Sequence, residues 1–245
     1  MNEVTQLMKN HTSVRKYLKE AIPKEKLYAL IEAAQYAATS KFVQAYSIIN
    51  VTDENMLRKI ARLSGNAHVA KCGAFLAFCA DIKRLEIACE MNGVTMDAQT
   101  TDHFIVATID ASLVAQNLVL ACESEGYGTC FIGGVRTNIE KISELLELPD
   151  KVALLFGLTI GVRGEENEVK PRLPLEAIVH ENTYQSKLYP GLLNDYDEVM
   201  KDYYSKRSNN QKEVTWTKSM GELFSVSSRK QVGEFLRKKG FLIDE

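Results

Sequence analysis

Two continuous apolar stretches, residues 71–81 (KCGAFLAFCAD) and 151–162 (KVALLFGLTIGV), constrain the fold more than any other feature of the sequence. Apolar runs of strand length without polar alternation are typical of strands covered on both faces. Helical patterns separate these runs from two more predicted strands, residues 46–53 and 126–134. Residues 1–162 are therefore expected to form one layered α+β or α/β domain.

The helical patterns that would cover such a sheet carry start and stop signals. Pro23 opens the first helix, and Gly65 is placed to end the second, residues 54–65. The longest pattern, residues 102–126, keeps Ile105, Ile109 and Leu113 at helical spacing and is apolar enough to be expected largely buried. A further amphipathic helix is predicted over residues 138–148.

The composition changes after residue 162. A polar, proline-punctuated loop covers residues 163–174, and helical patterns follow at 192–207, 215–225 and 229–241 without an obvious strand. Residues 163–245 are expected to be a helical extension of the same functional unit. It lacks a core of its own, so it must pack on the first region or on a partner subunit.

Charge and composition exclude several classes of function. Lys and Arg total 30 against 32 Asp and Glu, so no net field attracts nucleic acid or an acidic membrane. Without a secretory signal or a long enough apolar run, the chain is expected to be cytoplasmic and not membrane-bound. Five cysteines without a C-x-x-C pair and four isolated histidines indicate reduced thiols and no metal site.

His11, Ser13 and Arg15 stand at alternate positions near the N-terminus. In an extended segment they would point to one side, spaced ~6.6 Å apart, and three converging donors suit an anion such as phosphate. The alternative is that Ser13 caps a helix and Arg15 lies in water. This stretch alone favours the alternative, because charged surface runs are common.

The loop VKPRLP, residues 169–174, presents a second pair of cations. Pro171 and Pro174 favour extended neighbours, so Lys170 and Arg172 should project to the same side. Together with the N-terminal donors they would form a phosphate cradle, whereas the alternative is a plain surface loop. No G-x-x-x-x-G-K-[ST] or G-x-G-x-x-G motif occurs, so a nucleotide would bind without a Walker or Rossmann site.

Three further stretches are candidates for ligand contact, each with a structural alternative. Gly133 and Gly134 follow the predicted strand that ends in Phe131 and Ile132, and without side chains they would let the main chain approach a flat ligand closely. The alternative is that they form a tight turn. Thr39 and Ser40 supply short polar groups suited to a polyol, or are ordinary loop polarity. The basic residues of 203–212 would dock a second anion, or form a solvated charge run.

In this order, these stretches resemble the oxygen-insensitive nitroreductase and flavin reductase family, in particular its NADPH-linked FMN reductases. The pieces that carry the resemblance are HTSVRKY, AAQYAATSKFVQAYSII, VAQNLVLACESEGYGTCFIGGVRTNIEKISELLELP, LFGLTIGV, KPRLP, HENTYQ and YYSKRSNNQ. The resemblance implies an α+β fold with a mixed, mainly antiparallel sheet flanked by helices. It also implies a homodimer whose C-terminal helices embrace the partner, with FMN at the interface.

The resemblance also implies roles for individual residues. The FMN phosphate would be bound by His11, Ser13, Arg15, Lys170 and Arg172. Thr39 and Ser40 would contact the ribityl chain and the phosphate. The flavin ring would be contacted by Ile132, Gly133 and Gly134. Phe131, where the family commonly has a tyrosine, and Asn66, where it commonly has a glutamine, would also contact the ring. Arg207, with Lys206 beside it, would receive the 2′-phosphate of NADPH, and Arg229 would line the substrate channel. Lys41 departs from a serine run of the family and adds a cation near the cofactor.

The implied activity is a ping-pong reductase in which FMN takes a hydride from NADPH and passes the electrons to nitroaromatics, quinones, free flavin or azo compounds. NADH remains open as a donor, because the 2′-phosphate contact depends on one loop. The alternative is a flavin-binding carrier or sensor without turnover. The basic segment around Arg207 favours the enzyme, since a carrier needs no second anion site.

Overall fold

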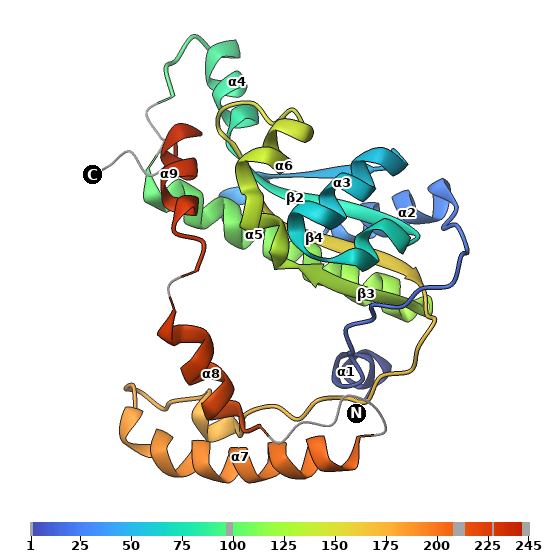
Figure 1. Cartoon of the computed structure of the whole chain (residues 1–245). Helices are drawn as coiled ribbons and strands as arrows, with labels where there is room; N and C mark the ends of the chain where they lie inside the picture. Colours follow the sequence, from blue (N-terminus) through green and yellow to red (C-terminus); the bar gives the residue numbers. More distant parts are fainter. Residues whose placement is uncertain (1, 97–99, 208–213, 227, 242–245) are drawn as a thin grey trace. The chain divides into compact units, whose positions relative to one another are not determined.

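The computed structural model describes residues 2–96, 100–207, 214–226 and 228–241, and it divides the chain into two compact units (Figure 1). Unit 1 consists of Met1–Asn167 and Arg229–Glu245, and unit 2 of Glu168–Ser228. The sequence analysis divided the chain into a core, residues 1–162, and an extension, residues 163–245. That division by function stays a prediction.

The core of unit 1 is a four-stranded sheet in the order β1-β2-β4-β3, with all neighbours antiparallel. The strands are β1 (Tyr46–Val51), β2 (Ala74–Asp81), β3 (Tyr127–Ile132) and β4 (Val152–Val162). The two apolar runs are the inner strands β2 and β4, and every residue of β2 is buried. The prediction of doubly covered central strands, and with it the α+β class, is confirmed.

Helices flank this sheet, as Figure 1 shows. The predicted ones are α2 (Lys24–Ala34), α3 (Glu54–Ser64), α5 (Thr101–Ser124), α6 (Ile139–Leu145) and α9 (Gln231–Lys238). Pro23 is the N-cap of α2, and Gly65 ends α3 in the left-handed conformation at φ 69°. Two helices had not been predicted, α1 (Glu3–Lys9) and α4 (Lys83–Met91).

Helix α5 differs from the prediction in one respect. Its buried face carries Ala107, Ala111, Val114, Leu118 and Cys122, but Ile105, Ile109 and Leu113 are 49%, 51% and 44% exposed. The expectation that α5 is largely buried is therefore wrong for this stripe. By length and composition α5 could also span a membrane. An exposed apolar stripe on an otherwise packed helix is typical of a protein interface.

All five cysteines are free. Burial raises the pKa of the Cys72, Cys79 and Cys122 thiols to about 12, and burial also raises the pKa of Cys130. These thiols are structural parts of the core.

The described residues of unit 2 include two short helical turns and the helices α7 (Tyr189–Lys206) and α8 (Trp216–Ser225). Tyr196 of α7 packs edge-on against Trp216, with ring centroids 6.0 Å apart. Buried Asp197 accepts hydrogen bonds from the amide and the hydroxyl of Thr217, which joins α7 to the start of α8. The predicted helices of this region are confirmed.

Candidate functional site

The segment that contains His11, Ser13 and Arg15 is extended and lies along β3. The Val14 amide donates to the Thr129 carbonyl at 2.9 Å, and Ser13 forms a parallel bridge with Thr129. Thr12 and Val14 are buried, His11 and Ser13 half-buried, and Arg15 exposed. The alternation therefore turns the three predicted donors to one side. Since α1 ends at Lys9, Ser13 does not cap a helix.

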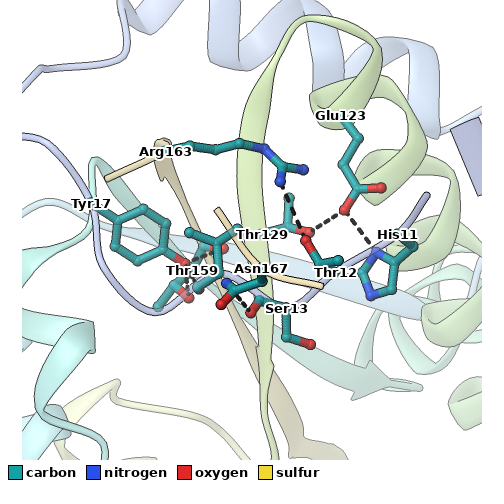
Figure 2. Close-up of polar contacts among 10 residues, drawn as sticks. His11, Thr12, Ser13, Tyr17, Glu123, Thr129, Thr159, Arg163 and Asn167 are labelled. Atoms are coloured by element: carbon teal, nitrogen blue, oxygen red, sulfur yellow. Dashed lines mark hydrogen bonds and ion pairs between the residues drawn. The ribbon is translucent and has the colours of Figure 1, made fainter. Parts of the chain in front are cut away.

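Hydrogen bonds to its backbone fix this segment, as Figure 2 shows in part. The Tyr17 hydroxyl donates to the Val14 carbonyl at 2.7 Å and lies 2.8 Å from the Thr159 hydroxyl; burial raises the pKa of Tyr17 and keeps it protonated. Glu165 accepts the Arg15 and Lys16 amides at 2.9 and 3.2 Å. Burial alone would raise the pKa of Glu165, but its hydrogen bonds outweigh burial and lower it.

His11 is held by a residue that the sequence analysis missed. Its Nδ1 lies 2.7 Å from Oε1 of Glu123, and the Thr129 hydroxyl donates to the same oxygen at 3.0 Å (Figure 2). The Glu123 side chain is 2% exposed and the His11 side chain 27%. A buried carboxylate inside an apolar helix was the available signal, because such a group needs partners.

The glycine pair opens the turn η3 (Gly133–Asn138), which follows Phe131 and buried Ile132. Neither glycine has a positive φ, so a need for left-handed backbone in a tight turn does not explain them. A Cβ on Gly134 would overlap the Asn66 amide and the Ser64 carbonyl. The structure thus brings two predicted ring contacts, Asn66 and Gly134, side by side.

His68 lies close to Asn66, in the turn η2 (Ala67–Lys71). The sequence analysis did not predict it as a site residue. Its Nε2 is buried and has no hydrogen-bond partner among the described residues. Burial lowers the pKa of His68, the charge of Arg15 lowers it further, and Glu165 opposes both. A neutral imidazole with a free nitrogen therefore lies within the electrostatic reach of Arg15.

Thr39 and Ser40 lie in a different part of unit 1. The turn η1 (Ser40–Phe42) contains left-handed Lys41 and Phe42 at φ 47° and 59°. Buried Asp110 holds this turn by accepting the Ser40 amide at 3.0 Å and the Ala45 amide at 3.1 Å. The Thr39 hydroxyl is buried and has no partner among the described residues.

The two groups of predicted contacts do not meet in one chain. Asp110 holds the Thr39–Ser40 turn and Glu123 holds His11, and thirteen positions of α5 separate these carboxylates (123 − 110). At about 1.5 Å per residue this is roughly 20 Å along the helix axis. Within one chain, a ligand that contacted both groups would have to span a distance of this order.

The other predicted cations lie partly in unit 2. Lys170 and Arg172 are exposed and line a cavity of about 480 Å³ with Tyr196, Tyr204 and Trp216, and Arg172 donates to the Lys170 carbonyl at 2.7 Å. Lys206 pairs with Asp202 at 2.7 Å, and Arg207 lies over the Tyr203 ring at 5.6 Å. Residues 208–213 of the predicted basic loop lie outside the described residues.

Arg229 is exposed on unit 1 in a left-handed conformation, φ 58°. Burial lowers the pKa of the Arg136 guanidinium, and the charge of Arg229 adds to this effect, so the two guanidinium groups lie near each other. Across the described residues, no cluster of three or more His, Cys, Asp or Glu side chains could hold a metal ion.

Family models identify this architecture. The model of the nitroreductase family matches residues 8–162, and that of the nitroreductase family C-terminal domain matches residues 170–244. The chain therefore belongs to the nitroreductase family, as its resemblance implied.

Individual relatives agree. The chain is 50% identical to a protein named Cr(VI) reductase from Pseudomonas sp. (strain G-1), covering 97% of this chain and 98% of the other. It is 38% identical to an FMN reductase (NADPH) from Bacillus subtilis (strain 168), covering 98% and 99%. The solved structure of NfrA1 from B. megaterium matches with a TM-score of 0.95 and 41% identity, covering 98% and 100%.

Proposed function

We propose that this protein is an FMN-dependent reductase that takes electrons from NADPH and passes them to nitroaromatics, quinones, free flavin or azo compounds. The observation that carries the proposal is the fixed side-by-side presentation of His11, Ser13 and Arg15 along β3. NADH is a second donor to test. A relative named Cr(VI) reductase makes chromate a further acceptor to test.

The donor set fits the phosphate of FMN. It combines an imidazole, a hydroxyl and a guanidinium, and in the described part of the chain no carboxylate lies within ion-pair distance of the Arg15 side chain. Arginine matches phosphate geometry through two parallel N–H groups. The unpartnered Nε2 of His68 and hydroxyl of Thr39 are polar atoms of the kind that a polar ligand satisfies.

The chain's own residues would bind and orient, since the flavin supplies the hydride chemistry when bound. His11, Ser13 and Arg15, with Lys170 and Arg172, would hold the phosphate. The backbone of Ile132, Gly133 and Gly134, with Phe131 and Asn66, would face the ring. Arg207 and Lys206 would receive the 2′-phosphate of NADPH, and Arg229 would line the acceptor channel. No nucleophile or acid–base pair is needed in this assignment.

The functional unit is a homodimer in this proposal. Two observations on unit 1 support it: the exposed Ile105, Ile109 and Leu113 stripe, and the separation of roughly 20 Å along α5 between the His11 site and the Thr39–Ser40 turn. The partner would then supply Thr39 and Ser40 to each flavin site.

An absorbance spectrum of the purified protein tests the proposal, followed anaerobically after addition of NADPH or, separately, NADH. A flavin spectrum that NADPH bleaches faster than NADH is the expected result. A yellow protein that neither donor bleaches would favour a flavin carrier or sensor. A colourless protein that takes up no added FMN would overturn the proposal.

A further inference from the structure

Glu123 is a buried carboxylate whose partners are few. Its Oε1 contacts His11 Nδ1 at 2.7 Å and the Thr129 hydroxyl at 3.0 Å. No Lys or Arg of the described residues lies within ion-pair distance of it. Because a buried carboxylate needs hydrogen-bond donors, the Nδ1 side of the His11 ring is one of the two groups in place to satisfy it.

The second nitrogen of His11, Nε2, points away from Glu123 (Figure 2). A neutral imidazole carries one N–H, and here Nδ1 would donate it to the carboxylate. Nε2 would then present a lone pair, which repels the acceptor oxygens of a phosphate. His11 can therefore hold Glu123 and a phosphate together only when both of its nitrogens carry a proton.

We propose that Glu123 is the positioning residue of the phosphate site, and that it couples FMN binding to the uptake of one proton at His11 Nε2. This inference rests on the proposed function, because it takes His11 as a phosphate ligand. The proton comes from water, so raising the pH opposes binding.

Other charged groups surround the segment without contacting the ring in the described structure. Arg163 at the end of β4 donates to the Thr12 hydroxyl at 3.3 Å, and Glu165 binds the Arg15 and Lys16 amides. Burial lowers the pKa of His68, with the charge of Arg15 adding to it, so His68 has lost its proton before the alkaline range. Among these groups, His11 is the one that contacts Glu123.

The experiment measures FMN affinity of the apoprotein between pH 6 and 9 by flavin fluorescence, with riboflavin in parallel. Riboflavin lacks the phosphate and should show no alkaline loss. For FMN, affinity should fall as pH rises. Glu123→Gln should lose affinity less steeply, because a Gln amide N–H can donate to His11 Nδ1 and leave the one proton of a neutral imidazole on Nε2. His11→Asn should remove the alkaline loss itself.

Glu125→Gln is the matched control. Glu125 is the C-cap of α5, two positions after Glu123, and its carboxylate pairs with Lys26 at 2.7 Å on the surface. Replacing it with Gln removes the same single negative charge. It should follow the unmodified protein at every pH. An alkaline loss that Glu123→Gln leaves unchanged would overturn the positioning role.

A second measurement needs no variant. Calorimetric titration at pH 8 in buffers of different ionisation enthalpy reports protons taken up on binding, at a pH where the flavin phosphate, with its second pKa near 6, is already ionised. Uptake with FMN and none with riboflavin is expected. FMN binding without proton uptake would overturn this inference and leave the proposed function intact, whereas absence of FMN binding at every pH would overturn the proposed function.

Discussion

A hydroxyl and a carboxylate hold the N-terminal segment by its backbone and so set the geometry of the proposed ligand contacts. Tyr17 and Glu165 bind the backbone at Val14, Arg15 and Lys16. Because they restrain the main chain, they orient the donors without contacting the phosphate. Changes at these positions should alter both the stability of the segment and the affinity of the site.

The lowered pKa of Glu165 predicts a specific dependence of stability on pH. A carboxyl whose folded pKa lies below its ordinary value of 4.5 stabilises the fold above that pH and loses this contribution as pH falls through the folded value. Glu165→Gln should therefore flatten the decline of Tm between pH 5 and 3. The neighbouring change Glu166→Gln serves as the control, and parallel acid declines for Glu165→Gln and the unmodified protein would contradict the prediction.

Arg15 provides the most direct residue-scale test of the phosphate site. A charge-assisted contact is worth about 1.5–3 kcal/mol, so Arg15→Ala should weaken FMN binding by roughly 10- to 100-fold. Equilibrium dialysis against FMN measures the change. Arg58→Ala is the control, because Arg58 pairs with Glu54 on the surface of α3. Full FMN retention by Arg15→Ala would remove Arg15 from the site.

The sequence predicted the shared side of His11, Ser13 and Arg15 better than the residues that hold this segment in place. Alternation was enough to place His11, Ser13 and Arg15 on one side, since period two is a local property of extended chain. Glu123 and Asp110 interrupt an apolar helix, and their partners are more than a hundred and about seventy positions away in sequence. Such pairings depend on the tertiary fold, which local patterns do not contain.

At the scale of elements, the close approach of the N-terminal segment to β3 depends on Gly128. A Cβ at this position would lie 2.7 Å from the Cβ of Val14, between the two proposed ligands Ser13 and Arg15. This contact explains a glycine inside a strand, whereas Gly126, at φ 82°, follows the end of α5.

Gly128→Ala should therefore destabilise the protein by roughly 1–3 kcal/mol and weaken FMN binding, because overpacking displaces the segment. Denaturant unfolding and FMN titration measure the two effects. Gly221→Ala in α8 has open space around it and should lower neither quantity. A double variant with Val14→Ala should recover part of the loss; strictly additive effects would exclude the contact as the cause.

The strands and most helices of the described residues were predictable, including the short β1, β3 and α6, whereas α1 and α4 were not. The inner strands β2 and β4 and helices α5 and α7 have eight or more residues of consistent pattern. Helix α1 has seven residues, none of them buried, and α4 also has no buried residue. Without an apolar face these two helices leave little signal, even though Asn2 caps α1 through the Thr5 amide.

At the scale of the whole molecule, the exposed stripe of α5 predicts how a dimer would be disrupted. Ile109→Asp places a charge in the stripe and should convert the dimer to monomer, with loss of FMN, as measured by analytical ultracentrifugation and absorbance. Ile87→Asp is the control on α4, at 45% exposure. A dimer that survives Ile109→Asp would place the interface elsewhere.

A shared site also predicts complementation between defective chains. Chains with Arg15→Ala and chains with Ser40→Ala should each bind FMN weakly. If Thr39 and Ser40 act on the partner's flavin, unfolding and refolding a mixture should restore one intact site in each mixed dimer. Recovery of tight FMN binding in about half of the mixed-dimer sites is expected, and no recovery would mean that each chain builds its own site.

The buried thiols bear on how the proposed reductase would withstand its own products. With a pKa of about 12, Cys72, Cys79 and Cys122 are ionised at pH 7 to a fraction on the order of 10⁻⁵, and the thiolate is the form that attacks electrophiles. Quinones and partly reduced nitro compounds alkylate thiolates. These three cysteines would therefore survive the repeated passage of such molecules, so that a catalyst with promiscuous acceptors would avoid covalent self-inactivation at its core.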